Sequence, residues 1–244
     1  MVYRKPVHPR VDRWSHRQTL LGRLIGAALA LLLIVAALIF ADRTAPSPPP
    51  GWKRLGLAGR VGHGKIGRVG ADCRAALAAD GVSWQESPDR PPQGFCQIQD
   101  AVVITGGAAR LEPLGAVMTC KEALAFTVWE RQVVQPQALR LLGAKVVSIQ
   151  HYGAFSCRRM YAGQDTSVSE HASADALDVA GFTLADGRRI SVAGDWRDPG
   201  PKGAFLHAAR DGGCGVFSVV LSPDYNAAHQ NHLHLDMGAS GVCH

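Results

Sequence analysis

The sequence predicts an α+β fold in which flanking helices cover a mainly antiparallel sheet, preceded by one apolar N-terminal segment. Helix signals are concentrated between residues 72 and 142, and mostly strand-like runs follow them. Two of these runs are joined by Ala185-Asp-Gly187, a connection typical of a hairpin between antiparallel strands. About 170 residues follow the N-terminal segments, which is ample for one hydrophobic core.

The chain begins with a basic segment and an apolar run. Residues 1–23 carry six basic residues and one acidic residue, and residues 24–41 form a run of eighteen residues without a charge. That length suffices for a transmembrane helix, and the positive flank places the N-terminus in the cytoplasm. A cleaved secretory signal is the alternative, but Leu38-Ile-Phe-Ala-Asp42 presents bulky residues where a signal peptidase needs small ones. We therefore expect a single-pass inner-membrane anchor with the rest of the chain in the periplasm.

The formal net charge of +6 is mostly a signal of membrane topology. The first 41 residues contribute +5 of it, which leaves about +1 for the remaining 203 residues. A domain so close to neutral gives little support for nucleic-acid binding, and we expect no nucleic-acid partner.

Residues 42–71 are predicted to form a periplasmic linker. Ala45-Pro-Ser-Pro-Pro-Pro50 is proline-rich, and residues 51–70 contain seven glycines with almost no apolar periodicity. The string Gly62-His-Gly-Lys-Ile-Gly67 matches a G-x-G-x-x-G pattern. The residues before it are too rich in glycine for the buried strand that a dinucleotide site requires, so we interpret the string as part of the linker.

The folded domain is predicted to span residues 72–244 and to open with a short helix. Asp72 is a suitable N-cap for a helix over residues 73–80, and Gly81 ends it. A further helix is expected around residues 203–211, among the strands of the second half.

Two consecutive helices are predicted in the middle of the chain. Thr119-Cys-Lys-Glu122 is a capping box, which begins a helix from residue 121 to about residue 134. Pro136 is expected to stop this helix and to begin the next one, over residues 136–142, because proline suits only the first helical turn. Gly143 ends the second helix.

Strands are predicted to dominate after the second helix. Their apolar and β-branched runs are bounded by Gly, Asp and Asn, as strands usually are. They cover residues 145–152, 176–182, 189–193, 215–221 and 231–236.

All cysteines follow the apolar run, which indicates disulfides in an oxidising compartment. The six are Cys73, Cys96, Cys120, Cys157, Cys214 and Cys243. Six cysteines allow fifteen pairings. Closure of sequence neighbours costs the least entropy, which favours the pairs 73 with 96, 120 with 157, and 214 with 243. A zinc-thiolate role is the alternative, but the chain has no Cys-x-x-Cys spacing.

Two short segments combine histidines with carboxylates at fixed spacing. They are Ser169-Glu-His171 through Asp178, and His229-Gln-Asn-His232-Leu-His234-Leu-Asp236, and they hold four of the ten histidines. Neutral imidazole nitrogens together with one carboxylate oxygen are typical zinc ligands. The pattern predicts Zn²⁺ as a cofactor.

Chain geometry restricts how these residues can meet. On a strand, His232 and His234 project to the same side, and the leucines next to them face the core. His171 and Asp178 are seven residues apart, which on a helix gives an axial offset of roughly 10 Å, too long for two ligands of one ion. We therefore expect His171 on a turn, then a bend, and Asp178 on the next strand. These two and one C-terminal histidine would leave a fourth position open for water, but a His-x-His pair can also supply two ligands.

These residues carry a resemblance. The pattern S-x-H-x(6)-D followed by H-x-x-H-x-H is similar to that of the zinc peptidase superfamily that includes lysostaphin-type enzymes, D-alanyl-D-alanine metallopeptidases, penicillin-insensitive murein endopeptidases and the hedgehog signalling domain. Within it, the chain most resembles the bacterial extensin-like C-terminal domain family, over roughly residues 72–244. The matching blocks are residues 155–158, 169–171, 176–178 and 232–236. Ala174 is a departure, because glycine is usual at that position.

The resemblance implies a role for individual residues. The expected metal ligands are His171, Asp178 and His234. His232 is expected to be the base that activates water, with His229 lining the site. Arg158 is a candidate for holding a substrate carboxylate or a developing oxyanion. Asp236 is either an acceptor that orients a ligand histidine or a surface carboxylate at the end of the strand.

Location and chemistry together predict a membrane-anchored periplasmic zinc metallopeptidase of the carboxypeptidase or endopeptidase type. The resemblance to murein peptidases implies peptidoglycan peptides as substrates, cut at amide bonds of D-amino acids. The alternative is a non-catalytic cell-wall-binding or assembly module that retains a structural zinc, as hedgehog relatives do. A simple extracytoplasmic metal-binding protein would need a closed site with four protein ligands. The presence of His232 as a base favours the enzyme.

Overall fold

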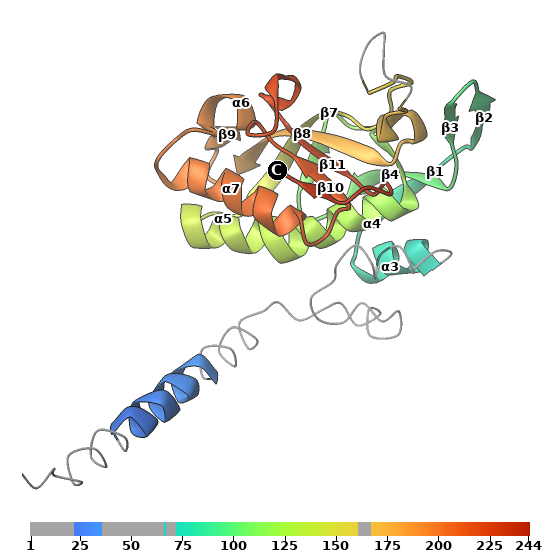
Figure 1. Cartoon of the computed structure of the whole chain (residues 1–244). Helices are drawn as coiled ribbons and strands as arrows, with labels where there is room; N and C mark the ends of the chain where they lie inside the picture. The colour runs from blue at the N-terminus through green and yellow to red at the C-terminus, as the bar shows by residue number, and fades with distance from the viewer. Residues whose placement is uncertain (1–21, 36–65, 67–71, 161–166) are drawn as a thin grey trace, which may run out of the picture. The chain divides into compact units, whose positions relative to one another are not determined.

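A computed structural model describes residues 22–35, 66, 72–160 and 167–244 (Figure 1). The chain divides into two compact units, Met1–Pro46 and Ser47–His244. In the first unit, residues 22–35 form a helix. Among the described residues, no helix is both long and apolar enough to cross a membrane.

The predicted N-terminal segments are described only in part. The anchor expected over residues 24–41 extends six residues past the described helix. The linker expected over residues 42–71, with its G-x-G-x-x-G string, lies outside the described residues except for Ile66. Both therefore stay predictions.

A seven-stranded sheet forms the centre of the second unit, with the order β12-β10-β11-β8-β7-β5 and with β9 paired to β8. All its pairs are antiparallel except β5 with β7 and β10 with β12. The strands are β5 (Arg110–Glu112), β7 (Val146–Gly153), β8 (Ala176–Leu184), β9 (Arg189–Ser191), β10 (Val219–Leu221), β11 (Leu233–Asp236) and β12 (Val242–Cys243). The predicted α+β class with a mainly antiparallel sheet is confirmed.

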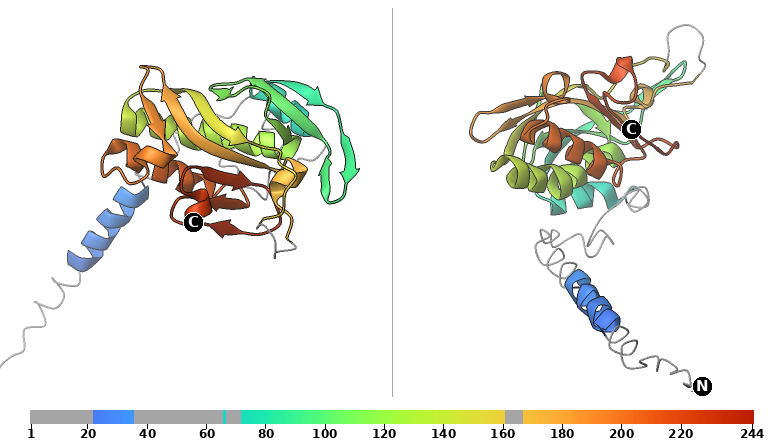
Figure 2. Two further views of the ribbon diagram at one scale, coloured as in Figure 1. Left: turned by 90° about the horizontal axis from the view of Figure 1, so that it is seen from above. Right: turned by 60° about the vertical axis from the view of Figure 1, so that its left-hand side comes forward.

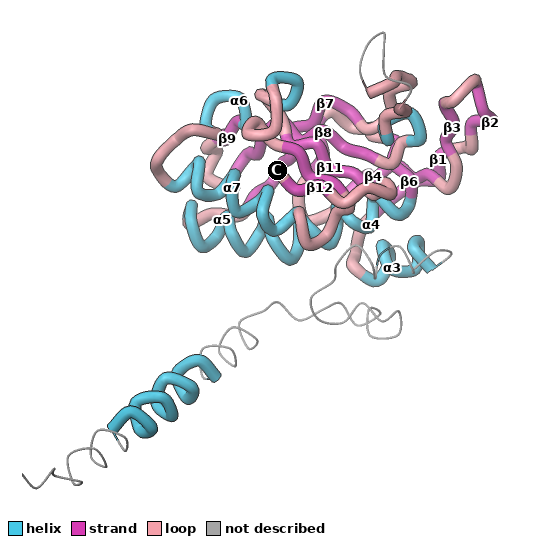
Figure 3. The backbone as a smooth tube through the Cα atoms, viewed as in Figure 1, coloured by secondary structure: helices cyan, strands magenta, loops and turns pink. Residues whose placement is uncertain are grey.

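Helices α4, α5 and α7 lie along one side of this sheet (Figures 1 and 3). The core between them is built around the fully buried Trp129 of α4. Its ring centroid is 6.2 Å from that of Phe182 on β8, and its indole N–H donates to Ala209 O of α7 at 2.9 Å. The helices are α3 (Cys73–Ala79), α4 (Cys120–Trp129), α5 (Gln135–Leu142), α6 (Val192–Asp195) and α7 (Pro201–Gly213).

The helix expected to stop before Pro136 does not stop there. A π-helical turn, η2 (Glu130–Val134), joins α4 to α5 without a break. The N–H of Gln135 donates to Glu130 O, five residues earlier, and this wider turn accommodates a proline that has no N–H of its own. Gly143 ends α5 in the left-handed conformation, with φ 71°, as predicted.

The capping box at the start of α4 is only half formed. Thr119 Oγ1 accepts the N–H of Glu122 at 3.1 Å, as expected. The N–H of Thr119 donates to Ala174 O instead of to the glutamate side chain. Glu122 is fully buried, and neither of its carboxyl oxygens has a hydrogen-bond partner among the described residues. Burial, with the nearby charges of Asp175 and Asp236, raises the pKa of Glu122 well above its usual value.

Several predicted strand and helix boundaries shift. The run predicted over residues 215–221 is a strand only at its end, in β10, and the run over residues 189–193 passes from β9 into α6. Helix α7 is longer than the predicted range of 203–211. The hairpin turn between β8 and β9 is confirmed: the N–H of Gly187 donates to Leu184 O at 3.0 Å.

Strands before α4 were not predicted. One group forms a three-stranded antiparallel sheet, and another forms a two-stranded arm that extends from the domain (Figure 2). The sheet contains β1 (Ser83–Ser87), β4 (Ala101–Gly106) and β6 (Val117–Thr119), and the arm contains β2 (Arg90–Gln93) and β3 (Cys96–Ile98).

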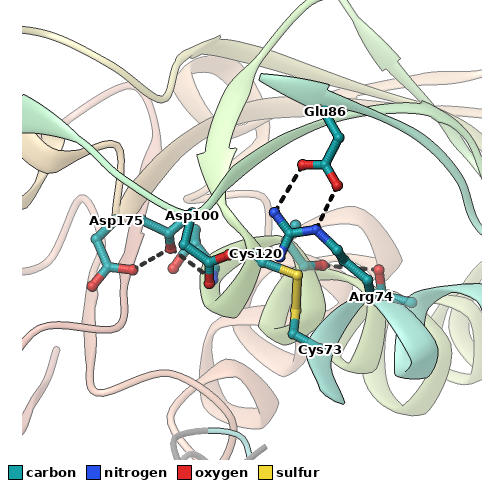
Figure 4. Close-up of a disulfide and its surroundings, with 10 residues drawn as sticks. Cys73, Arg74, Glu86, Asp100, Cys120 and Asp175 are labelled. Atoms are coloured by element: carbon teal, nitrogen blue, oxygen red, sulfur yellow. Dashed lines mark hydrogen bonds and ion pairs between the residues drawn. A yellow bond between two sulfur atoms is a disulfide. The ribbon is translucent and has the colours of Figure 1, made fainter. Parts of the chain in front are cut away.

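All six cysteines are paired, but only one predicted pair is confirmed. The bonds are Cys73–Cys120, Cys96–Cys157 and Cys214–Cys243. The first two predicted pairs are wrong because loop-closure entropy belongs to the unfolded chain and does not decide which sulfurs meet in the folded one. Figure 4 shows the first bond, which joins α3 to the start of α4 beside an ion pair between Arg74 and Glu86.

Candidate metal centre

Two of the expected ligands face each other across adjacent strands. His234 on β11 is the direct antiparallel partner of Asp178 on β8. Leu233 and Leu235 are fully buried on the opposite face of β11, which is the alternation that the sequence predicted. Hydrophobic burial on one face thus fixes the side on which His234 and Asp178 project.

The third expected ligand comes from a turn before β8. His171 lies in the 3₁₀ helix η3 (Glu170–Ser173), where the hydroxyl of Ser169 accepts the N–H of His171. A bend then leads into β8, as expected from the exclusion of a helix. Ala174 makes this bend with φ 59°, in the left-handed region that favours glycine. This explains why glycine would suit the position.

Three potential ligand atoms converge on one point. His171 Nε2 is 3.2 Å from Asp178 Oδ1 and 3.2 Å from His234 Nδ1, and the last two atoms are 3.0 Å apart. With metal–ligand bonds of about 2.0–2.1 Å, a tetrahedral zinc ion holds its ligand atoms roughly 3.3 Å apart. The donor set and its spacing therefore fit Zn²⁺.

The hydrogen bonds behind the two histidines fix where their protons are. His171 Nδ1 lies 2.8 Å from Ala154 O, which can only accept, so Nδ1 carries the proton. His234 Nε2 lies 2.9 Å from Asp236 Oδ2 and donates to this carboxylate. In their neutral forms, both rings therefore direct a lone pair at the Asp178 carboxylate. Three facing lone pairs require a cation between them, either a metal ion or a proton.

The pKa shifts around the centre also indicate that a cation is needed there. In the metal-free site, burial acts to lower the pKa of His234. Its hydrogen bonds to Asp178 and Asp236 outweigh the effect of burial and raise this pKa to about 9. Burial acts to raise the pKa of Asp178, but its hydrogen bonds to His171 and His234 hold it far below the usual value. Asp236 is buried, so the open question about it is answered: it accepts from His234 and is no surface carboxylate.

His232 lies beside the three atoms without joining them. It precedes β11, and its Nε2 approaches Asp178 Oδ1 to 3.4 Å. Within the described part of the chain, the group of ligand atoms that lie within 4.8 Å of one another contains His171, Asp178 and His234 only. The Nδ1–H of His232 donates to Asn231 Oδ1 at 2.8 Å, which leaves Nε2 free to accept a proton. Burial lowers the pKa of His232, so it is neutral at neutral pH.

His229 and Arg158 lie near the same centre. His229 ends the 3₁₀ helix η4 (Ala227–His229), and its ring centroid is 5.2 Å from that of His232 and 5.8 Å from that of His234. Burial is the main cause that lowers the pKa of His229 to about 4, and repulsion from His232 and His234 in their protonated forms contributes. Arg158 is exposed, and its charge also lowers the pKa of His229 and His232.

Two aromatic residues at the site were not predicted. Tyr152 on β7 is 60% exposed and lies edge-on to His232, with centroids 6.0 Å apart. Tyr225 lies edge-on to His229 at 5.6 Å. The pairing of β7 with β8 brings Tyr152 to the site, and no local sequence pattern states that pairing.

Residues at the start of α4 contact the ends of both strands that carry the site. Lys121 Nζ forms an ion pair with Asp175 at 2.7 Å and donates to Met237 O at 2.9 Å. Thr119 Oγ1 also donates to Asp175, at 2.6 Å. The residue before β8 and the residue after β11 are therefore tied to one helix end.

Comparison with known proteins gives one match. A family model described as extensin-like protein C-terminus matches residues 71–244, and the chain belongs to this family. A search of curated proteins and a search of solved structures each found no match.

Proposed function

We propose that this member of the extensin-like C-terminal family is a zinc-dependent peptidase. The observation that carries the proposal is the set of three inward lone pairs, of His171, Asp178 and His234, each histidine with an outer acceptor that fixes its tautomer. Histidines that bind metals have such outer acceptors almost without exception. Three protein ligands with a free base beside them are typical of a catalytic site.

His171, Asp178 and His234 would hold the ion. Zn²⁺ held there supplies a Lewis acid that makes water nucleophilic at neutral pH and polarises an amide carbonyl. His232 Nε2 takes up the proton of the attacking water, because its other nitrogen is already committed to Asn231. Since its pKa is lowered, His232 is in the basic form at the start of the reaction.

Arg158 and His229 have further roles at the site. The exposed guanidinium of Arg158 binds a substrate carboxylate or stabilises the developing oxyanion. His229 donates through Nδ1 to Asn226 Oδ1 at 2.8 Å and directs its ring toward His232 and His234, where it lines the site. Its low pKa keeps a second positive charge away from the metal.

We propose peptidoglycan peptides as the substrate, cut at amide bonds of D-amino acids by carboxypeptidase or endopeptidase action. The support is the resemblance of the two motifs to those of murein peptidases, together with location. An inner-membrane anchor over residues 24–41 and a linker over residues 42–71 would let the domain reach the wall from the periplasm. Three disulfides in the domain are consistent with an oxidising compartment.

A non-catalytic wall-binding or assembly module is the second candidate. The observation in its favour is the low exposure of the ligand side chains, 2% for His171, 15% for Asp178 and 10% for His234, because structural ions are usually well enclosed. Such a module needs the ligands but has no use for His232 as a base.

The test is hydrolysis of defined muropeptides by the purified protein, followed by mass spectrometry. Zinc-loaded protein is expected to release a peptide or amino-acid product, and chelator is expected to abolish the release. His232→Ala, loaded with zinc to the same content, is the matched control. An unchanged muropeptide profile with zinc-loaded native protein would favour the wall-binding module.

A further inference from the structure

The turn that carries His171 packs on a small hydrophobic cluster that is separate from the main core. This satellite cluster is formed by Ile98, Ala101 and Ala174, with Phe155 packed against it. The strands that carry the other two ligands are buried in the main core instead. Because so few side chains are buried in the satellite cluster, hydrophobic burial alone constrains His171 weakly.

The segment after β7 holds His171 through its backbone. Ala154 O accepts the Nδ1–H of His171 at 2.8 Å, and the N–H of Ser156 donates to His171 O at 2.9 Å. Cys157, the next residue, is bonded to Cys96 on β3. β3 itself lies against η3. One disulfide thus joins the segment that orients His171 to the strand on which His171 rests.

Two cation–π contacts also join the arm to this segment. Every residue of β2 is exposed. The guanidinium of Arg90 lies 5.4 Å from the ring of Phe155, and that of Arg159 lies 4.8 Å from the ring of Phe95. Cation–π contacts of exposed guanidinium groups are weak, so the covalent disulfide is a stronger link than either of them.

We propose that Cys96 and Cys157 are a positioning pair for the metal centre. Their bond holds residues 154–156 against η3, so that His171 keeps its Nδ1–H on Ala154 O and its Nε2 toward Asp178. Without the bond, the sheet still places two ligands, while the third becomes mobile. The effect on metal affinity rests on the proposed function, but the orientation of His171 does not, because it can be measured in the metal-free protein.

The experiment compares the full chain carrying Cys96→Ser with Cys157→Ser against a matched control. The control carries Cys214→Ser with Cys243→Ser and removes the disulfide between the end of α7 and β12. In metal-free protein, NMR should show a protected ring N–H resonance of His171 in the native chain and in the control, and its loss in the test variant. Zinc affinity, measured by competition with a chromophoric chelator, should fall roughly 10- to 100-fold in the test variant only.

The outcomes separate this inference from the proposed function. A protected His171 resonance and native zinc affinity in the test variant would overturn the inference. Loss of the resonance in the test variant alone, with no zinc bound by the native chain, would support the positioning role and overturn the metal function. If the test variant does not fold, Phe155→Ala takes its place: it keeps the disulfide and should keep the resonance, whose loss would show that packing, not the bond, positions His171.

Discussion

His234 on β11 lies directly opposite Asp178 on β8, and its Nδ1 is 3.0 Å from Asp178 Oδ1. A slip of one residue in this register would turn one of the two side chains into the core. Leu233 and Leu235, both fully buried, oppose such a slip. The sheet core therefore fixes the distance between two candidate ligands.

Replacing His234 and replacing His232 should have different effects. His234→Ala removes one of three ligands, so zinc content should collapse and any hydrolysis with it. His232→Ala leaves three ligands in place, so zinc should stay bound while hydrolysis falls roughly 10²- to 10⁴-fold, the usual effect of losing a positioned base. Metal analysis beside turnover distinguishes the two.

His171→Ala and Asp178→Ala serve as controls and should behave like His234→Ala. If His232→Ala loses zinc as completely as these variants, both histidines of the C-terminal pair are ligands. The open coordination position would then disappear, and the assignment of His232 as the base would be wrong.

Asp236→Asn should weaken zinc binding without removing a ligand. An amide N–H₂ placed at His234 Nε2 favours the other ring tautomer, which puts a proton on Nδ1 where the lone pair is needed. The zinc dissociation constant should rise roughly 10- to 100-fold, measured by chelator competition. Asp186→Asn, at an exposed carboxylate of the β8–β9 turn, should leave it unchanged. Native affinity in Asp236→Asn would mean that the ring orientation does not depend on this acceptor.

The sequence was informative about the site wherever spacing restricts geometry. Period 2 placed His232 and His234 on one face, and the axial offset between His171 and Asp178 excluded a helix. The role of Asp236 stayed open because a sequence does not show whether a strand end is buried. Tyr152 was missed because its neighbour His232 is eighty residues away in the sequence and meets it only through pairing of strands.

The fold was predictable where local signals agree with tertiary structure. Two such signals are the end of α5 at Gly143 and the β8–β9 turn at Gly187. Both follow from positive-φ backbone conformations that glycine adopts easily. The helix break predicted at Pro136 was wrong, because a π-helical turn accommodates the proline within a continuous helix. The disulfides Cys73–Cys120 and Cys96–Cys157 join residues far apart in the sequence, so no local pattern indicated them. Strand β2 was not predicted because it contains Pro91 and Pro92 and has no apolar alternation.

The expected membrane topology gives a third prediction. If residues 24–41 form an anchor, a periplasm-active reporter fused after Gly51 should be active. The full-length protein should also stay in the membrane fraction, because the apolar run and its basic flank are retained. Fractionation with mass spectrometry of the N-terminus measures both. An N-terminus found within residues 41–46 would show cleavage of the segment instead.

The raised pKa of Glu130 predicts a change in the free energy of unfolding with pH. The Glu130 side chain is buried in η2, where Gln135 donates to it at 3.2 Å. Burial raises the pKa of Glu130 to about 7, against hydrogen bonds from Gln135 and the backbone of Ala109. The unfolded chain loses this proton near pH 4.5, so between pH 4.5 and 7 the folded state binds more protons and the free energy of unfolding falls as pH rises. The whole effect is on the order of 3 kcal/mol.

Glu130→Gln should remove the contribution of this residue to the pH dependence, because a neutral amide has no proton to lose. The free energy of unfolding, measured with urea at pH 5 and pH 8, should fall less between the two values in the variant than in the native chain. At pH 8 the variant should be the more stable of the two. Asp211→Asn, at an exposed carboxylate near the end of α7, is the control and should leave the difference between the two pH values as in the native chain. An identical pH dependence in Glu130→Gln and the native chain would mean that Glu130 does not contribute to it.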